Sequence, residues 1–335
     1  MKKIKVIQYG LGAMGSKMVD MVLRKEELEL VGAVCRSKEK IGKDIGELLG
    51  LGKKIGVKCY DEDYVFKNIK ADVVLHAAVS YVPEVWKQIK KAVQAGMNVI
   101  TIAEEMGYPF AKYTKISKEM DKLAKKHKVT ILGSGINPGF AMDYLPLALT
   151  GILQDVNSIR VTRLVNFAPF GQSIQNNIGI GLTLQEFRKG VANGSLPVHI
   201  GLPESVHMVA RAMKWKIDNI KEVKEPVVAK KKIKVPGYKS VEAGKVCGFD
   251  QRCYGYSKGK LKILLEELGR VDPKIDYKNT IYIDGNPKLI ESMNVPSGNL
   301  TTTGHAVNLI PAVVNAKPGL LTMLDIPIAP CLKNK

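Results

Sequence analysis

The chain has 335 residues, of which 45% are hydrophobic and 25% are charged, proportions typical of soluble globular proteins. No apolar run approaches the length of about 18 residues that a membrane span needs, and the apolar part of MKKIKVIQYG is too short for a signal peptide. The 51 basic and 32 acidic residues give a net charge of +19, as some nucleic-acid-binding proteins have. The length allows two domains, or one α/β domain with an insertion.

The basic residues do not form a nucleic-acid-binding pattern. Lysines are spread along the chain, and the densest run, AKKKIKVPGYK at 229–239, alternates like a strand with one solvated face. Aromatic residues make up only 6% of the chain and do not interleave with these lysines as a base-stacking surface requires. We therefore expect no nucleic-acid partner, and a lysine-rich surface that attracts anionic cofactors.

The cysteines and histidines show no metal-site spacing. The cysteines are odd in number, are widely scattered and form no C-x-x-C motif, which favours a reduced, cytoplasmic protein without a zinc site. They are Cys35, Cys59, Cys247, Cys253 and Cys331. The histidines also lack metal-ligand spacing. We predict no bound metal.

Strands and helices alternate through the first part of the chain. The predicted strands cover 3–9, 28–36, 71–78, 97–105 and 129–139. The predicted helices cover 16–28, 37–49, 82–96 and 117–128. Such alternation with short links predicts a doubly wound, parallel sheet in an α/β domain at 1–150.

The pattern changes beyond residue 150. The predicted strands are longer and antiparallel, and they cover 157–168, 225–235, 246–257 and 279–286. The predicted helices cover 182–194 and 203–215. We expect an α+β domain with a mostly antiparallel sheet at 151–300. A terminal helix within 301–320, with threonines at its start and Pro318-Gly319 at its end, is expected to pack back on the first domain.

The stretch IQYGLGAMGSKM has the spacing G-x-G-x-x-G between the first strand and the first helix. In that setting Gly10 permits a tight turn, Gly12 lets the backbone approach a pyrophosphate, and Gly15 lets the helix pack on the strand. This context is the one that a dinucleotide-binding loop requires. The predicted cofactor-binding residues here are Gly10, Leu11, Gly12, Ala13, Met14 and Gly15.

The end of the second strand indicates which nicotinamide cofactor is used. An NAD site usually has an acidic residue there, whereas this chain has Arg36, Ser37 and Lys38. These residues favour NADP, with NAD use left open. The alternative is that Arg36 and Lys38 are surface cations. His76 and Ala78, at the end of the third strand, lie on the expected path of the cofactor; Ala78 is expected to contact it, and His76 is a packing residue more often than a catalyst.

Two segments follow strands at the edge where ligands of such sheets bind. One holds Glu104 and Glu105, and the other is GSGINPGFAMD at 133–143. Adjacent carboxylates that leave a strand point to opposite sides, so at most one faces the cofactor. If that one is buried, its pKa would rise and it could act as a general acid/base. The alternative is two solvated glutamates. No G-x-S-x-G, H-E-x-x-H or Walker A motif offers another chemistry.

These segments together carry a family resemblance. YGLGAMG, NVITIAEEMGYPFA, GSGINPGFAMDYLPLALTG and TTTGHAVNLIPAVVNAKPGLLTM make the chain similar, over essentially its whole length, to 2,4-diaminopentanoate dehydrogenases. That family belongs with the native amine dehydrogenases of the dihydrodipicolinate-reductase-like superfamily. The AEE and GINPG segments are specific to the group, whereas every Rossmann enzyme shares the glycine loop.

The resemblance implies a fold and a reaction. The fold would have an N-terminal Rossmann domain, a C-terminal α+β domain that forms a homodimer, and an active site between them. The reaction would be the NAD(P)⁺-dependent oxidative deamination of the 4-amino group of 2,4-diaminopentanoate, a step of ornithine fermentation. The products would be 2-amino-4-oxopentanoate, ammonia and NAD(P)H. The family's catalytic glutamate falls on Glu104 or Glu105, and the sequence leaves this choice open.

The sequence offers fewer signals for the residues that bind the substrate. Asn137, Pro138 and Gly139 are expected to shape the pocket floor, and Asn137 also to meet the nicotinamide. On RVTRLVN, Arg163 and Asn166 are candidates for the substrate carboxylate, although a surface strand would show the same alternation. His305 and Asn308 lie one helical turn apart and could face the substrate, although helix capping and packing also explain them.

Several other functions share parts of this pattern. One alternative is an amine dehydrogenase that reductively aminates simple ketones. Another is a non-catalytic Rossmann protein that senses NADP or binds nucleic acid, but a sensor needs no acid beside the nicotinamide. Activities like those of homoserine dehydrogenase or dihydrodipicolinate reductase would need a catalytic lysine or a histidine-rich segment, which we do not find. The expected ligand is a diamino acid or amine, with no membrane partner.

Overall fold

The computed structural model of the chain describes residues 2–235, 240–272, 275–294 and 298–335. These residues form two units, which are described separately below. The first unit contains the residues up to Gly139 together with Leu300–Lys335, and the second contains Phe140–Asn299. Within the described residues, no helix combines the length and the apolar character needed to cross a bilayer.

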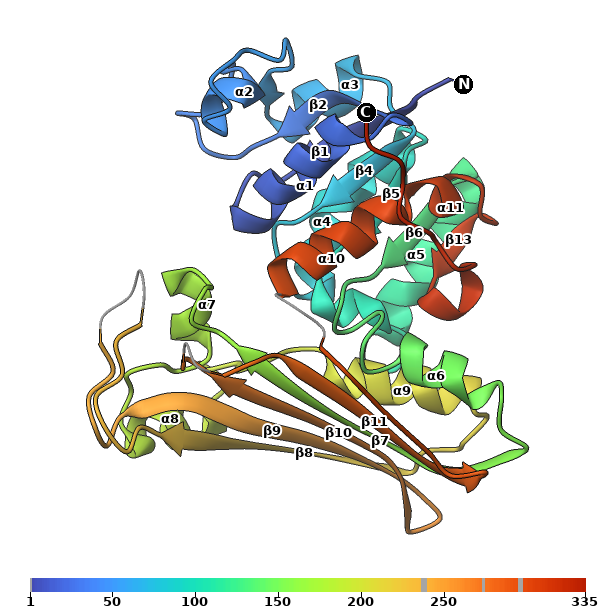
Figure 1. Cartoon of the computed structure of the whole chain (residues 1–335). Helices are drawn as coiled ribbons and strands as arrows, with labels where there is room; N and C mark the ends of the chain where they lie inside the picture. Colours follow the sequence, from blue (N-terminus) through green and yellow to red (C-terminus); the bar gives the residue numbers. More distant parts are fainter. Residues whose placement is uncertain (1, 236–239, 273–274, 295–297) are drawn as a thin grey trace. The chain divides into compact units, whose positions relative to one another are not determined.

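A parallel sheet forms the centre of the first unit (Figure 1). Its strands lie in the order β13-β6-β5-β4-β1-β2-β3, and all their pairings are parallel. Their bounds are β1 (Ile4–Tyr9), β2 (Leu28–Val34), β3 (Cys59–Tyr60), β4 (Val73–His76), β5 (Asn98–Thr101), β6 (Thr130–Gly133) and β13 (Gly319–Leu321). The chain reverses its direction of travel across the sheet at β1, as a doubly wound sheet does.

Helices and short turns connect these strands. They are α1 (Ala13–Arg24), α2 (Ile45–Leu48), α3 (Glu62–Asn68), α4 (Val82–Gln94), α5 (Thr114–His127), α10 (Gly298–Asn308), α11 (Ile310–Val314) and the 3-10 turns η1 (Glu104–Gly107) and η2 (Met323–Asp325). Helix α4 shows why they pack: Val85, Ile89 and Val93 recur at helical spacing and are fully buried in the core against β-strand residues such as Val74.

Two predicted helices of this unit are shorter than expected. The stretch 37–49 is helical only at Ile45–Leu48, because the Asp44 carboxylate accepts hydrogen bonds from the backbone N–H groups of Gly46, Ile55 and Gly56 and thereby organises a loop. The terminal stretch 301–320 is not one helix. It forms α10 and α11 and ends in β13, which pairs with β6 at the edge of the parallel sheet.

The second unit contains a mixed sheet with the strand order β12-β11-β7-β10-β9-β8. Strands β7 and β10 pair in parallel, and the other pairs are antiparallel. Their bounds are β7 (Asp155–Asn166), β8 (Asn219–Val228), β9 (Val246–Ser257), β10 (Lys260–Arg270), β11 (Lys278–Asn286) and β12 (Leu289–Met293). A parallel, doubly wound sheet and a second, mostly antiparallel sheet were both predicted, and this α/β class is confirmed.

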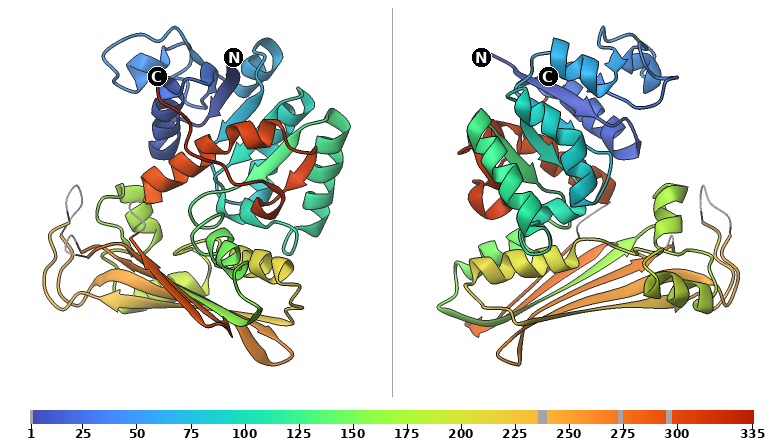
Figure 2. Two further views of the ribbon diagram at one scale, coloured as in Figure 1. Left: turned by 45° about the vertical axis from the view of Figure 1, so that its right-hand side comes forward. Right: turned by 180° about the vertical axis from the view of Figure 1, so that it is seen from behind.

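Helices cover one face of the mixed sheet. The helices of this unit are α6 (Tyr144–Thr150), α7 (Gln172–Asn177), α8 (Leu184–Ala192) and α9 (Leu202–Ala212). Phe187 of α8 packs in one apolar cluster with Val165 of β7 and Phe249 of β9. Figure 2 shows α9 lying along the same sheet. Val206 of α9 packs against Gly255 of β9, where a Cβ atom would lie 2.8 Å from Val206 Cγ1.

The strand predictions need two corrections in this unit. The strand expected at 225–235 is instead β8 at Asn219–Val228, and beyond it only an isolated bridge joins Ile233 to Val241. Residues 236–239, the end of the lysine-rich run, lie outside the described residues. Strands β10 and β12 were not predicted at all, although β10 lies centrally in the sheet between β7 and β9.

Candidate active site

The glycine loop between β1 and α1 has the predicted conformation. Gly10 has a φ of +90°, and a Cβ atom there would lie 2.6 Å from the carbonyl oxygen of Ala77. A Cβ on Gly15 would collide with the carbonyl of Gly10, so the helix approaches the strand as closely as expected. A Cβ on Gly12 would meet nothing within 4 Å. Each glycine therefore has the geometry that the sequence assigned to it.

This loop leaves the start of α1 open to an anion. Gly12 is the N-cap residue and offers no side-chain cap, so the first N–H groups of the helix remain available to a phosphate. The buried amide of Gln8 donates hydrogen bonds to the carbonyl oxygens of Tyr9 and Gly10, at 3.2 and 3.1 Å, and fixes the turn. Ala78 lies beside Gly10. Of the other loop residues, Leu11 is buried, Ala13 is exposed and Met14 is half-buried. The chain thus fits a dinucleotide at this place.

A cavity of about 410 Å³ opens at the ends of β1 and β2. It is lined by Tyr9, Val34, Cys35, Arg36, Asp61, Glu62, Lys87 and Gln88. The Tyr9 hydroxyl donates a hydrogen bond of 2.8 Å to Glu62 Oε2. Burial and the bond to Glu62 raise the pKa of Tyr9 to about 12, while its hydrogen bond with Arg36 opposes this rise. Arg36, Tyr9 and Glu62 therefore form one polar group on the cavity wall.

Two of these residues were not predicted. The sequence shows no acid at the end of β2, but the start of α3 brings Asp61 and Glu62 into the same cavity as Arg36. The sequence signals only that a helix begins here, because Asp61 caps α3 by accepting a hydrogen bond from the N–H of Tyr64. Ser37 and Lys38 are exposed and do not line this cavity.

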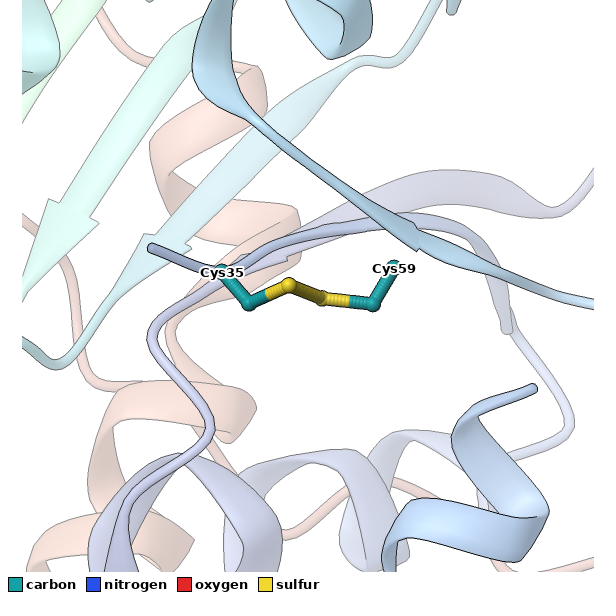
Figure 3. The surroundings of a disulfide bond; sticks show 2 residues. All are labelled: Cys35 and Cys59. Atoms are coloured by element: carbon teal, nitrogen blue, oxygen red, sulfur yellow. A yellow bond between two sulfur atoms is a disulfide. The ribbon is translucent and has the colours of Figure 1, made fainter. Parts of the chain in front are cut away.

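A disulfide joins Cys35 to Cys59 at the cavity (Figure 3). The two cysteines are 24 residues apart in sequence, but they lie at the ends of the neighbouring strands β2 and β3, with their Cα atoms 6.1 Å apart. The scattered spacing of the cysteines did not predict this pair. The remaining three, Cys247, Cys253 and Cys331, are free. Among the described residues no His, Cys, Asp or Glu cluster has the composition of a metal site.

The two adjacent glutamates after β5 have different environments. Glu105 is 2% exposed, and its carboxylate accepts hydrogen bonds from the N–H of Val82 at 3.0 Å, from Lys112 Nζ at 2.5 Å and from the Tyr113 hydroxyl at 3.1 Å. Val82 is the first residue of α4, so Glu105 caps that helix. Burial lowers the pKa of Lys112, but its hydrogen bond to Glu105 outweighs this and raises the pKa above its ordinary value.

Glu104 is half-buried at the start of η1. Within the described part of the chain, no hydrogen bond or ion pair engages its carboxylate, whose charge acts on the neighbouring Tyr81 hydroxyl and contributes to the raised pKa of that tyrosine, after burial and Glu105. The turn after β5 therefore holds one carboxylate, of Glu105, that the fold engages and one, of Glu104, that has no such contact among the described residues.

His76 supports this turn from within the sheet. Its Nδ1 lies 2.8 Å from Thr101 Oγ1 and its Nε2 lies 2.9 Å from Gln88 Oε1. Because the amide oxygen of Gln88 can only accept, a neutral His76 donates to it from Nε2 and accepts at Nδ1 from the Thr101 hydroxyl. Burial lowers the pKa of His76 to about 4. His76 is a neutral packing residue.

The GINPG segment lies against the turn that carries Glu104. A Cβ on Gly107 of η1 would approach the ring of Pro138 to 2.8 Å. Gly139 has a φ of +125°, and its backbone hydrogen-bonds to His305 of α10. Burial lowers the pKa of His305 to about 4. Asn137 is 9% exposed beside these residues. The structure therefore brings together Glu104 and the predicted loop within the first unit.

The remaining substrate candidates divide into two kinds. Arg163 is 3% exposed on β7, and its Nη1 has no hydrogen-bond partner among the described residues. Asn166 is committed to the fold, because its Oδ1 accepts from the N–H of Ala168 and its Nδ2 donates to the carbonyl of Ile275. Asn308 is committed likewise, since its Oδ1 accepts from the N–H of Leu332.

A parallel doubly wound sheet with a glycine turn, an open helix N-terminus and a carboxylate beside the strand ends defines the class of NAD(P)-dependent oxidoreductases. The comparisons with known proteins agree. Residues 140–335 match the family model described as 2,4-diaminopentanoate dehydrogenase C-terminal domain. Residues 4–102 match the model described as dihydrodipicolinate reductase, N-terminus.

Full-length relatives support the same assignment. The 2,4-diaminopentanoate dehydrogenase of Acetoanaerobium sticklandii is 38% identical over 98% of this chain and 94% of its own length. An amine dehydrogenase of Streptomyces virginiae is 24% identical over 98% of both chains. The solved structure of an amine dehydrogenase from Mycobacterium smegmatis is 28% identical, with a TM-score of 0.88 over 98% of this chain and 97% of that one. The chain belongs to the 2,4-diaminopentanoate dehydrogenase family.

Proposed function

We propose that this enzyme oxidatively deaminates the 4-amino group of 2,4-diaminopentanoate, giving 2-amino-4-oxopentanoate, ammonia and a reduced nicotinamide cofactor. The observation that carries the proposal is the difference between Glu104 and Glu105. A buried, helix-capping Glu105 leaves Glu104 as the carboxylate that can exchange protons with a substrate. The name of the relative with 38% identity supports the choice of substrate.

The chain's own residues would hold the cofactor at the ends of β1 and β2. The open N-terminus of α1 and the residues Gly10–Gly15 would bind the pyrophosphate, with Ala78 beside them. Arg36 would pair with a 2′-phosphate in the cavity that it shares with Glu62. NADP is therefore the favoured cofactor. When bound, the nicotinamide supplies the acceptor for the hydride from C4 of the substrate.

Glu104 performs the proton transfers of this reaction. Its carboxylate takes a proton from the 4-ammonium group, which frees the nitrogen lone pair that forms the C=N bond as the hydride leaves C4. The acid passes this proton to the solvent, and the restored carboxylate stabilises the iminium cation. It takes a proton from the attacking water as the C–O bond forms, and returns it to the nitrogen before the C–N bond breaks. As that bond breaks, the hydroxyl proton passes to the departing ammonia, which leaves a ketone and an ammonium ion. Overall, one ammonium substrate and one water give one ketone, one ammonium ion, one hydride for the cofactor and one proton.

The other predicted residues bind and orient the substrate. Asn137, Pro138, Gly139 and His305 shape the place where the reacting carbon lies, since this loop packs on the turn of Glu104. Arg163 binds the substrate carboxylate through its unpartnered Nη1. Asn166 supports the neighbouring backbone. We further propose that the enzyme acts as a homodimer in the cytoplasm, in the fermentation of ornithine.

A substrate comparison tests this function. The pure enzyme is mixed with NADP⁺ or NAD⁺ and with 2,4-diaminopentanoate, alanine, homoserine or pentan-2-amine, and the absorbance of the reduced nicotinamide is followed. We expect the highest kcat/KM with the diamino acid. Preference for pentan-2-amine would instead favour a simple amine as the substrate; two relatives are named amine dehydrogenases. No turnover of the diamino acid with either cofactor would overturn the proposal.

A further inference from the structure

A row of polar side chains crosses the mixed sheet of the second unit. In the strand register, Arg163 of β7 lies opposite Asn279 of β11 on one side and opposite Glu267 of β10 on the other. Glu267 lies opposite Gln251 of β9, and Gln251 lies opposite Lys224 of β8. Residues directly opposite each other in a sheet point to the same face. All five side chains therefore share one face, which is the face that α8 and α9 cover.

The rows on either side of this polar row are apolar. On one side, Val165 and Phe249 belong to the apolar cluster that contains Phe187 of α8. On the other side, Val161, Leu265 and Cys253 are fully buried. A line of charged and amide groups between two apolar layers is costly, unless its hydrogen-bonding groups are satisfied.

One end of the row is satisfied by the protein itself. The Gln251 amide donates to the carbonyl oxygen of His199 and to Glu222, and accepts from the N–H of His199. Lys224 donates to the carbonyl oxygen of Pro197. These side chains hold the segment before α9 in place, so this half of the row has a structural role.

The other end of the row is not satisfied. Arg163 and Asn279 are 3% and 0% exposed, yet Arg163 Nη1 and Asn279 Oδ1 have no hydrogen-bond partner among the described residues. The amide nitrogen of Asn279 is used, since it donates to the carbonyl of Ala141. Glu267, 2% exposed, lies between this end and His199, whose Nδ1 is 3.4 Å from Glu267 Oε2. A cation with an open donor thus lies between an open amide acceptor on one neighbouring strand and a carboxylate on the other.

These three groups are complementary to the head group of an α-amino acid. A guanidinium binds a carboxylate through charge-assisted hydrogen bonds, and an ammonium group needs carboxylate or carbonyl acceptors. We propose that Arg163 binds the α-carboxylate of the substrate, and that Glu267 and Asn279 accept hydrogen bonds from its α-ammonium group. This inference rests on the proposed function, and it explains why a diamino acid would be preferred to an amine without a head group.

The probe for this subsite is 2-aminopentanoate, which carries the head group but no 4-amino group and therefore cannot be deaminated there. Its dissociation constant is measured by calorimetry with the whole enzyme, and compared with those of pentanoate and pentan-2-amine. We expect 2-aminopentanoate to bind the wild-type enzyme at least tenfold more tightly than either, because each lacks one half of the head group. Equal binding of all three would overturn the proposal without any variant.

Variants with matched controls locate the subsite. Arg163→Lys keeps the positive charge but loses the planar guanidinium with its paired N–H donors. Glu267→Gln keeps the shape of the side chain but loses its negative charge. Each should weaken 2-aminopentanoate binding by about 10- to 100-fold, as loss of a hydrogen bond to a charged group does. Arg160→Gln and Glu266→Gln are the controls, since these residues lie on the same strands, pair with each other at 2.6 Å and point to the opposite face. Similar affinity in all four variants would overturn the proposal.

The outcomes also separate this subsite from the proposed reaction. An enzyme that binds 2-aminopentanoate through Arg163 and Glu267 but does not oxidise 2,4-diaminopentanoate would support the subsite and overturn the reaction. An enzyme that oxidises the diamino acid with the same KM in all four variants would support the reaction and overturn the subsite.

Discussion

The carboxylate of Glu105 accepts a hydrogen bond from the backbone N–H of Val82, the first residue of α4, at a distance of 3.0 Å. The same carboxylate binds Lys112 and Tyr113. Glu105 therefore stabilises the helix that follows β4, whereas its neighbour Glu104 has no such contact within the described residues. Two adjacent glutamates thus have separate tasks, and paired substitutions can separate them.

We predict that Glu104→Gln lowers kcat by about 10²- to 10⁴-fold, the usual contribution of a general acid/base. Its free energy of unfolding should stay within about 0.5 kcal/mol of the wild type, as for most substitutions outside the core. Glu105→Gln should instead destabilise the protein by about 2 kcal/mol, because a buried, charged cap is lost. Steady-state kinetics and urea denaturation measure both effects. The reverse pattern would assign the acid/base role to Glu105.

The sequence predicted the parts of this site that depend on local signals. The glycines of the first turn and the apolar spacing of α4 each specify a conformation within a few residues, and the structure has both. The sequence could not choose between Glu104 and Glu105, because that choice depends on where the N-terminus of α4 lies in space. Their spacing alone permits either role.

Features that depend on strand pairing were not predicted from the sequence. Strand β3 has only two residues, so nothing in the sequence indicated that Cys59 lies beside Cys35 or that Glu62 reaches Arg36. Strand β10, KLKILLEELGR, shows no clean alternation, and the position of Glu267 beside Arg163 follows from a parallel pairing between strands about a hundred residues apart. Such non-local register cannot be deduced from periodicity.

Arg36→Ala should change the choice of cofactor. The guanidinium lines the cavity at the end of β2 and hydrogen-bonds to Tyr9. We expect the dissociation constant of NADP to rise by about 10- to 100-fold, as for a lost hydrogen bond to a phosphate, and that of NAD to change by less than about threefold. Calorimetric titration with 2′,5′-ADP and ADP measures the same difference without turnover. Equal losses for both nucleotides would show that Arg36 does not bind the 2′-phosphate.

The disulfide between Cys35 and Cys59 predicts how many cysteines react with a thiol reagent before and after reduction. Protein denatured without reductant should react with a thiol reagent at three cysteines, and at all five after reduction. The Cys35→Ser variant should be less stable by about 3 kcal/mol, the loop-closure contribution expected for cysteines 24 residues apart. Cys331→Ser, at an exposed free cysteine, is the control. Five reactive thiols before reduction would contradict the disulfide.

Acid should destabilise the first unit through two buried histidines. His76 and His305 have pKa values of about 4, lowered by burial from the ordinary 6.5. Between these values the unfolded chain binds more protons than the folded one, so the free energy of unfolding falls as the pH falls from 6.5 to 4. Each histidine contributes a loss of about 3 kcal/mol at the acid end. Urea denaturation as a function of pH should show a smaller slope for His76→Gln, and an unchanged slope would contradict this assignment.

The position of bond breaking tests the central claim most directly. The enzyme is given 2,4-diaminopentanoate deuterated either at C4 or at C2, together with NADP⁺ or NAD⁺, and the reduced cofactor is examined by mass spectrometry. We predict deuterium in the cofactor only from the C4-labelled substrate, with one ammonia released for each cofactor reduced, and almost no transfer in the Glu104→Gln variant. Deuterium transferred from C2, or full transfer by the Glu104→Gln variant, would contradict the account.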